Sequence, residues 1–283
     1  MYTLHKSKHG TPMEIVGFFS GGASSLVAIL EEQEKFDDWF RPYKVTCAFT
    51  DNPEASGIKK LSKFDIPLIV RDIDSFYAKR GIKDYRQKVN DPEERKKLDK
   101  RLVRDIRNEY DNENSVTILG NMYDWDEIDF GLLSGYMWYM TDPMLRLFEV
   151  IMNVHPADLT ITKEGGRRRF IGDNAVYDAI KAGQTYTKSS IHIVTDGVDE
   201  GPLVVQSKPL FVEGLTDEIK NDDKLLREFA LKHQSRMKDE CDIPAFKKAV
   251  ELTAEGKVAM DDDKIYIGYD DEWKPAPAGF QLN

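Results

Sequence analysis

A buried β-strand with a polar tip is predicted by Leu145-Arg146-Leu147-Phe148-Glu149-Val150-Ile151-Met152-Asn153-Val154-His155-Pro156. Because side chains alternate between the two faces of a strand, Asn153 and His155 project from one face while Val154 points into the core. An amide beside an imidazole can polarise a carbonyl oxygen, since the amide donates a hydrogen bond and a protonated ring offsets negative charge. The pair also fits an ordinary turn, in which Asn caps the reversal and His is a satisfied structural residue.

The composition is that of a globular protein with a substantial core, because 41% of the 283 residues are hydrophobic and 32% are charged. The net charge of -10 disfavours binding along a nucleic-acid backbone, although a local basic pocket could still hold one small anion. The two cysteines, Cys47 and Cys241, form neither a disulfide framework nor a zinc-ligand spacing, so we expect a cytoplasmic protein without a metal. We recognise no signal peptide and no run of roughly 20 apolar residues that would span a membrane.

Strands and helices alternate over the first seventy residues of the chain. The pattern predicts strands at 14–19, 43–49 and 66–70, with helices at 26–32 and 55–64 between them. Such alternation is typical of an α/β fold with a doubly wound, mostly parallel sheet.

The turn after the first strand consists of small residues, Ser20-Gly21-Gly22-Ala23-Ser24-Ser25. A strand, a small-residue turn and a helix together present backbone N–H groups and a helix N-terminus to an anion. Ser24 and Ser25 can cap the helix and donate hydroxyls to a phosphate. A tight turn without a ligand explains the same residues, and neither G-x-G-x-x-G nor the Lys-Ser/Thr ending of a P-loop is present.

The middle of the chain is charged and then aromatic. Residues 94–110 have apolar side chains at helical intervals, so we expect an amphipathic helix whose basic run Arg95-Lys96-Lys97 faces solvent. Apolar pieces at 115–119 and 131–133 flank an acidic loop at 123–127. The run Ser134-Gly135-Tyr136-Met137-Trp138-Tyr139-Met140 could form one wall of a flat apolar ligand slot, although core packing is the more ordinary explanation.

A second polar loop follows the strand tip. Residues 163–169, Lys-Glu-Gly-Gly-Arg-Arg-Arg, predict an exposed hairpin or loop tip. Strands predicted at 190–194 and 203–206 flank a loop that contains Asp196 and Asp199. A carboxylate near His155 would orient the ring and raise its pKa, although both acids could also make local backbone bonds. Further helices are predicted at 172–182, 225–238 and 244–255, and a terminal strand at 264–268.

Three motifs, taken together, resemble the folate-dependent formyltransferases, and within them the glycinamide ribonucleotide formyltransferases of purine synthesis are most similar. They are S-G-x-x-S-x-L-x-A-I at 20–29, N-x-H-P at 153–156 and S-x-H-x-V-T-x-x-x-D-x-G-P at 190–202. The resemblance implies a formyltransferase fold over residues 13–283 as a single domain. Its Rossmann-like half, about 13–130, would bind phosphate, and the half at about 131–283 would bind folate and carry the catalytic residues.

The resemblance also implies roles for individual residues. Asn153, His155 and Asp199 correspond to the catalytic residues, with His192 and Pro156 in support, and Asp239 or Glu240 would contact the amine. The phosphate-binding residues implied are Ser20, Gly21, Gly22, Ala23, Ser24, Ser25 and Arg95. The folate-binding residues implied are Tyr136, Met137, Trp138, Tyr139, Met140, Thr195, Asp196, Val198 and Asp199.

The expected reaction uses 10-formyltetrahydrofolate as co-substrate and glycinamide ribonucleotide as acceptor, in a monomer or homodimer without a metal. Two departures from the family pattern bear on the acceptor. The loop at 20–25 lacks the family's last Asn, and Arg167 to Arg169 form an insertion. We hypothesise that this insertion contacts the glutamate tail of folate or the substrate phosphate, although a solvated tip is the more ordinary explanation.

Other functions remain open at this stage. The acceptor could be another amine, such as an amino-sugar nucleotide, or water, as in the related hydrolases. Those hydrolases carry an extra N-terminal domain, and only about a dozen residues precede the first predicted strand here. A nucleotide-dependent oxidoreductase would use the 20–25 turn with Asp51, but its glycine spacing is missing. A non-catalytic binding protein would not need Asn153, His155 and Asp199.

Overall fold

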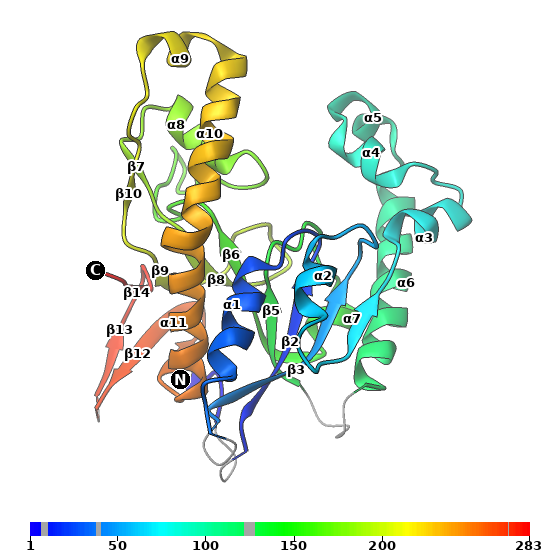
Figure 1. Cartoon of the computed structure of the whole chain (residues 1–283), viewed down its shortest axis with the longest axis vertical. Helices are drawn as coiled ribbons and strands as arrows, with labels where there is room; N and C mark the ends of the chain where they lie inside the picture. Colours follow the sequence, from blue (N-terminus) through cyan, green and yellow to red (C-terminus); the bar gives the residue numbers. More distant parts are fainter. Residues whose placement is uncertain (7–10, 38–40, 122–127, 271) are drawn as a thin grey trace.

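An eight-stranded mixed sheet forms the centre of the computed structural model, which describes residues 1–6, 11–37, 41–121, 128–270 and 272–283 (Figure 1). The strand order is β14-β9-β8-β6-β5-β2-β3-β4, and the five strands from β6 to β4 are mutually parallel. β8 runs antiparallel to both β6 and β9. The predicted α/β fold with a mostly parallel sheet is therefore confirmed. The strands are β2 Met13–Phe19, β3 Tyr43–Thr50, β4 Leu68–Val70, β5 Ile128–Leu133, β6 Phe148–His155, β8 Ser190–Ile193, β9 Leu203–Gln206 and β14 Phe280–Gln281.

Helices cover both faces of this sheet, which explains why its central strands are almost continuously apolar. Successive residues of β2 alternate between two hydrophobic clusters, with Ile15 in one and Val16 in the other. Leu26 of α1 and Phe246 of α11 belong to the first cluster, whereas Ile106 of α6 belongs to the second. The two clusters therefore lie on opposite faces of the sheet.

The helices differ from the predicted ones mainly in the charged region. The predicted helix at 94–110 is two helices, because Asp99 leaves the helical conformation and caps α6 by accepting hydrogen bonds from two backbone N–H groups. The apolar piece at 115–119 is the end of α6, and the acidic loop at 123–127 lies outside the described residues. The helices are α1 Ser24–Gln33, α2 Gly57–Leu61, α3 Ile73–Lys79, α4 Tyr85–Asn90, α5 Pro92–Lys97, α6 Lys100–Leu119, α7 Asp142–Leu145, α8 Ala175–Lys181, α9 Asp217–Asn221, α10 Asp223–Met237, the π-helix η1 Lys238–Asp242 and α11 Ile243–Ala254.

Within the described ranges, none of these helices combines the length and apolarity needed to cross a membrane.

A second sheet, of four antiparallel strands, lies beside α11 (Figure 1). The predicted strand at 264–268 is confirmed as β12, but the sheet around it was not predicted. Val258 and Ile265 of this sheet belong to the same hydrophobic cluster as Ile15 of β2. The four strands are β1 Tyr2–Thr3, β11 Val258–Asp261, β12 Lys264–Tyr269 and β13 Glu272–Pro275, and a separate pair is β7 Tyr186–Thr187 with β10 Leu210–Phe211.

The order of the strands creates a switch point in the large sheet. From β2 the chain moves outward through β3 and β4, then returns to the other side of β2 to form β5 and β6. The carboxyl ends of β2 and β5 therefore diverge into different connections, and ligands of open α/β sheets bind at such a point. The loop at 20–25 follows β2 and the segment at 134–140 follows β5, so both lie at this edge.

Candidate functional site

Asn153 lies opposite His192 in the antiparallel pair of β6 and β8. The Asn153 Nδ2 atom is 3.3 Å from His192 Nε2. His192 Nδ1 is 2.9 Å from the carbonyl oxygen of Ile193, which assigns the ring hydrogen to Nδ1 in the neutral tautomer. Nε2 then accepts one N–H of the Asn153 amide. The second N–H of this half-buried amide remains for a ligand.

The Asp199 carboxylate lies between two histidine rings. Its Oδ2 atom is 3.4 Å from His155 Nδ1, and its Oδ1 atom is 3.4 Å from His192 Nε2. The backbone N–H of Gly172 donates to Oδ2 at 2.9 Å. The ends of β6 and β8 and the turn at 199–201, which are distant in sequence, therefore meet, with His155 and His192 on the buried Asp199 carboxylate and Asn153 on His192.

The backbone of the 199–201 turn is strained. Asp199 has a φ of 54°, in the left-handed region that residues other than glycine adopt infrequently, with Asp and Asn among those that adopt it most often. A Cβ atom on Gly201 would lie 1.9 Å from the carbonyl oxygen of Ile193, so only glycine fits there. Strain of this kind persists where surrounding contacts enforce it, and it is concentrated at functional sites.

Arg168 supplies one such contact. Its guanidinium donates to the carbonyl oxygens of Asp199 and Gly201, the latter at 2.8 Å. The predicted hairpin is confirmed by the bridge between Thr162 and Arg168, and Arg167 and Arg169 are exposed on it. The hypothesis that all three arginines meet an anionic ligand is therefore wrong for Arg168, whose charge supports the Asp199 turn.

The His155 ring is enclosed. Its Nε2 atom is 2.9 Å from the carbonyl oxygen of Phe170, and the residue is 5% exposed. Burial lowers the pKa of His155 and outweighs the opposing effect of Asp199, so the ring is neutral at pH 7. The sequence-based expectation of a raised pKa was wrong because it considered the carboxylate without the loss of solvent.

The pKa of Asp199 is lowered, so this carboxylate keeps its negative charge. Burial alone would raise the pKa of this carboxyl group. The nearby His192 and His155 rings and the N–H of Gly172 outweigh burial and lower the pKa to about 2. The site therefore combines a neutral imidazole with a carboxylate that can stabilise a proton on it.

The loop at 20–25 leads into α1 without the side-chain cap that was predicted. The residue before α1 is Ala23, with a φ of 51°, and no side chain caps the helix. The predicted capping by Ser24 and Ser25 is wrong, because both lie in the first turn and Ser134 Oγ accepts from the N–H of Leu26 instead. The loop nevertheless begins a ten-residue helix at the switch point, which is suitable for an anion.

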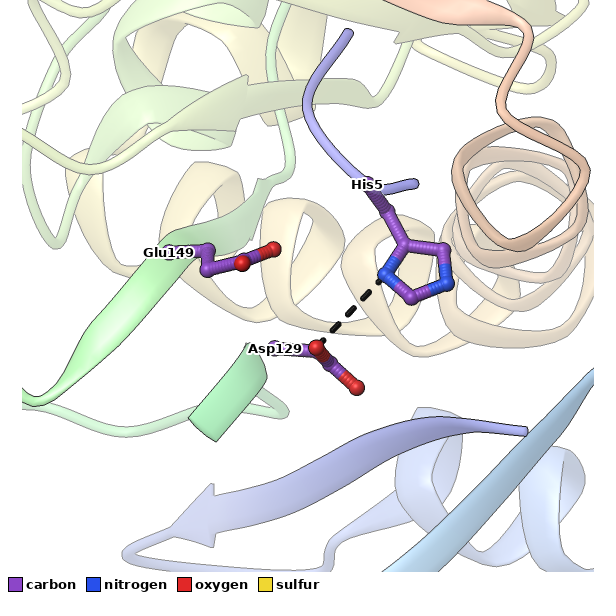
Figure 2. A group of neighbouring side chains, drawn as sticks. All are labelled: His5, Asp129 and Glu149. Carbon is purple, nitrogen blue, oxygen red and sulfur yellow. Dashed lines mark ion pairs between the residues drawn. The ribbon is translucent and has the colours of Figure 1, made fainter. Parts of the chain in front are cut away.

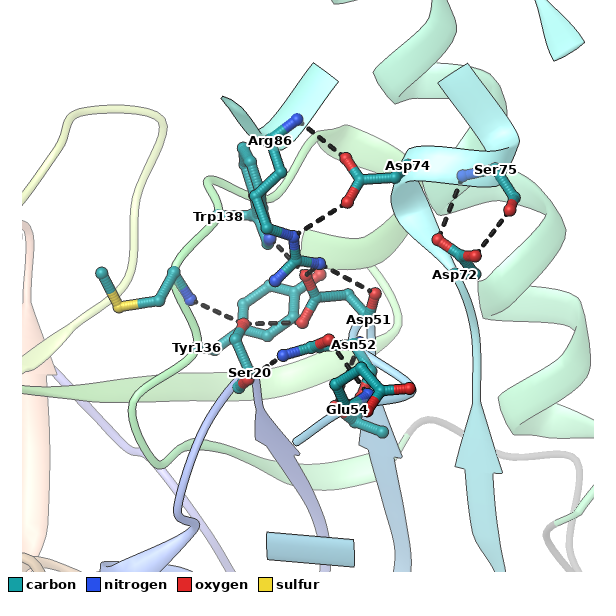
Figure 3. A network of polar contacts seen from close by, with 12 residues as sticks. Ser20, Asp51, Asn52, Glu54, Asp72, Asp74, Ser75, Arg86, Tyr136 and Trp138 are labelled. Carbon is teal, nitrogen blue, oxygen red and sulfur yellow. Dashed lines mark hydrogen bonds and ion pairs between the residues drawn. The ribbon is translucent and has the colours of Figure 1, made fainter. Parts of the chain in front are cut away.

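The Ser20 hydroxyl belongs to a network of hydrogen bonds around Asp51 (Figure 3). Its hydroxyl donates to Asp51 Oδ1 at 2.6 Å and accepts from the N–H of Met137 at 3.0 Å. Asp51 Oδ2 accepts from Trp138 Nε1 and lies 3.3 Å from the Arg86 guanidinium. Burial raises the pKa of Asp51, while the hydrogen bond from Ser20 and the charge of Arg86 oppose that rise. Asp51 thus connects the 20–25 loop, the 136–140 segment and α4. Because the Ser20 hydroxyl is bonded to Asp51, it is not available to a phosphate.

Lys60 of α2 places a positive charge at the 20–25 loop, and the sequence analysis did not predict this contact. The Lys60 amino group donates to the carbonyl oxygen of Gly22 at 3.0 Å, and the N–H of Gly57 donates to Gly21 at 2.9 Å. Arg95, the predicted phosphate ligand, is exposed on α5, which Figure 1 shows well apart from α1. Lys60 is therefore the better placed cation. The Gly-Ile-Lys-Lys sequence at 57–60 gave no signal beyond an amphipathic helix.

The 136–140 segment divides between core and surface. Tyr136 and Met140 are buried in the second hydrophobic cluster, which supports the packing explanation for these two side chains. Trp138 stacks on Tyr85 with ring centroids 5.3 Å apart. The remaining candidates, Met137, Tyr139, Thr195, Asp196 and Val198, are exposed.

The π-helix η1, which contains Asp239 and Glu240, lies against α1. Glu240 is paired with Arg236 at 3.2 Å, whereas Asp239 is exposed. Asp242, at the end of η1, accepts a hydrogen bond from Ser189, and burial raises its pKa to about 6. Because π-helical turns are frequent at functional sites, the residues of η1 form a second group of candidate site residues.

Comparison with known proteins finds similarity over most of the chain. A family model described as formyl transferase matches residues 13–225. Phosphoribosylglycinamide formyltransferase of Haemophilus influenzae is 23% identical over 208 residues, which are 73% of this chain and 77% of that protein. At such identity, sequence similarity alone leaves the acceptor open.

Solved structures also share the fold, and two examples follow. The crystal structure of phosphoribosylglycinamide formyltransferase from Anaplasma phagocytophilum has a TM-score of 0.61 at 21% identity, covering 96% of this chain and 98% of its own. The structure of a formyltetrahydrofolate deformylase from Pseudomonas syringae pv. tomato has a TM-score of 0.58 at 14% identity, covering 91% of this chain and 66% of its own.

Replacing Asp199 by Asn is expected to reduce stability in a pH-dependent way. The pKa of Asp199 falls from the ordinary 3.8 to about 2 on folding, so the carboxylate stabilises the folded chain above pH 4 and loses this effect as pH falls. The difference in unfolding free energy between wild type and Asp199→Asn should be about 2 kcal/mol at pH 7 and about half of that at pH 3. Urea unfolding at several pH values measures it.

The matched control is Glu200→Gln, which removes the exposed neighbouring carboxylate and should change stability by less than about 0.5 kcal/mol. A difference for Asp199→Asn that stays constant or grows toward pH 3 would contradict this electrostatic account.

Proposed function

The chain belongs to the formyl transferase family, and on that basis we propose that it transfers a formyl group from 10-formyltetrahydrofolate to the primary amine of glycinamide ribonucleotide. The meeting of Asn153, His155 and Asp199 at the carboxyl edge of the sheet carries the proposal. The loop at 20–25 follows β2, which is two strands from β6, so roughly 10 Å separates the two strand ends. A nucleotide whose phosphate lies at the loop could therefore present its amine to the catalytic residues.

Asn153 stabilises the charge that forms on the formyl oxygen. The amine nitrogen attacks the formyl carbon, and the carbonyl oxygen becomes negatively charged as the tetrahedral intermediate forms. The N–H of Asn153 that His192 does not use donates to this oxygen. Because the amide is already oriented by His192, little reorganisation is needed when the charge develops.

His155 and Asp199 transfer the proton that the attacking amine loses. The attacking amine must lose a proton. In the neutral ring Nε2–H donates to the Phe170 carbonyl, so Nδ1, the nitrogen that faces Asp199, accepts this proton, whereas a ring charged from the start could not. Asp199 then stabilises the imidazolium, which in turn offsets the negative oxygen. The proton finally passes to the departing tetrahydrofolate nitrogen. The neutral resting state of His155 thus suits a proton relay.

Substrate binding uses the flanking segments. In our proposal the phosphate lies at the backbone N–H groups of residues 21–25, with Lys60 in place of Arg95 as the cation. The backbone of 136–140 and the exposed 195–198 turn hold the pterin. Asp239 meets the amine end of the acceptor, because Glu240 is already paired with Arg236.

The direct test follows 10-formyltetrahydrofolate consumption with and without glycinamide ribonucleotide. We expect consumption to depend on the ribonucleotide and to produce one formylated amine per folate consumed. Consumption without any acceptor would instead identify a hydrolase, as in the deformylase that shares the fold. Consumption only with an amino-sugar nucleotide would retain formyl transfer and replace the proposed acceptor.

Replacing Arg168 by Ala is expected to slow formyl transfer by about ten- to a hundredfold, because hydrogen bonds from a charged group to the carbonyls of Asp199 and Gly201 are worth about 1.5–3 kcal/mol. The effect should fall mainly on kcat, since Arg168 positions the Asp199 turn. Steady-state kinetics with both substrates measures it.

The control for this variant is Arg167→Ala, which removes an exposed arginine one residue away and should retain kcat within about twofold. Equal kinetics for the two variants would show that Arg168 does not position the turn.

A further inference from the structure

His5, Asp129 and Glu149 form a cluster at the opposite edge of the large sheet (Figure 2). Asp129 lies near the start of β5 and Glu149 near the start of β6. His155 ends β6 six residues beyond Glu149, so roughly 20 Å of strand separates this cluster from the catalytic residues. The formyl transfer proposed above makes no use of it.

His5 is buried without a matching hydrogen-bond partner. The residue is 4% exposed, and neither of its ring nitrogens makes a hydrogen bond to any residue that the structure describes. Nδ1 faces Asp129 Oδ1 at 3.6 Å, as the dashed line in Figure 2 shows. A buried polar group that lacks a partner typically costs about 1–3 kcal/mol, so among the described residues this histidine is a candidate to bind a further ligand.

We propose that His5, Asp129 and Glu149 bind a divalent transition-metal ion of the zinc class. Each residue offers one ligand atom, and these atoms all lie within 4.8 Å of one another. In a tetrahedral zinc site with bonds of about 2.1 Å, neighbouring ligand atoms are about 3.4 Å apart. The His5–Asp129 distance is already close to that value, and the Glu149 carboxylate lies within 4.8 Å of both other ligand atoms.

The donor set favours zinc over calcium or magnesium. An imidazole nitrogen with two carboxylates suits zinc, whereas the two hard cations prefer sites made of oxygen atoms alone. The N–H of Glu14 donates to Asp129 Oδ2 at 2.7 Å and thereby fixes the orientation of this carboxylate. Three protein ligands leave the fourth position to water.

The role of the ion would be structural. His5 follows β1, which pairs with β11 in the four-stranded sheet, whereas the two acids belong to the eight-stranded sheet. A bound ion would therefore fasten the N-terminal segment to the starts of β5 and β6. No sequence motif indicates this site, because its three residues have no metal-ligand spacing.

The test titrates untagged, chelator-treated full-length protein with zinc, using a chromophoric chelator as competitor and thermal unfolding as a second readout. We expect one zinc ion per chain. At a zinc concentration about one hundred times Kd, Tm should rise by about 5 °C. Absence of stoichiometric zinc binding would overturn the proposal.

Two variants locate the site. Glu149→Gln changes an exposed residue and should preserve folding, and His5→Gln removes the buried ligand. Each should weaken zinc binding by more than about tenfold, since even the loss of an outer-shell partner has an effect of that size. Should His5→Gln fail to fold, Glu149→Gln alone decides the result.

The control is Asp199→Asn, which alters the other cluster of histidine and carboxylate groups and should leave zinc affinity unchanged. Zinc binding that persists in Glu149→Gln and is lost in Asp199→Asn would place the ion at the catalytic residues and contradict the proposal.

Discussion

The shared contact of one buried carboxylate with two histidine rings is the interaction on which the candidate site depends. Asp199 contacts both His155 and His192, and its backbone adopts a left-handed conformation. Arg168 and the N–H of Gly172 hold that conformation from the hairpin side. The hairpin that looked like a solvated insertion in the sequence is therefore part of the support of the catalytic carboxylate.

The sheet topology determines what else can meet this carboxylate. Because β5 lies next to β6 and β2 lies next to β5, all in parallel, the loop at 20–25 and the segment at 136–140 occupy the same edge as the tip of β6. Asp51 fixes their mutual position through Ser20 and Trp138. An acceptor and a folate bound at these segments would thus share one rigid frame, in which the reacting atoms need little adjustment.

Local patterns predicted the parts of the fold in which periodicity and turn chemistry act within a few residues. The apolar run before Asn153 identified β6, and the alternation of strands and helices identified the parallel sheet. Properties that depend on tertiary environment could not be predicted in this way. Burial reversed the expected pKa shift of His155, and Lys60 reached the loop from a separate helix. The periodicity of apolar residues predicted one helix at 94–110, whereas Asp99 caps α6 and separates it from α5.

Turnover of the Asp199→Asn variant measures the central claim most directly, because asparagine keeps the shape of the side chain and removes its charge. With saturating 10-formyltetrahydrofolate and glycinamide ribonucleotide, the account predicts that kcat falls by at least about a hundredfold, while circular dichroism shows a folded chain. Glu200→Gln should retain kcat. Equal turnover in the two variants would show that the carboxylate between the two histidines takes no part in the chemistry.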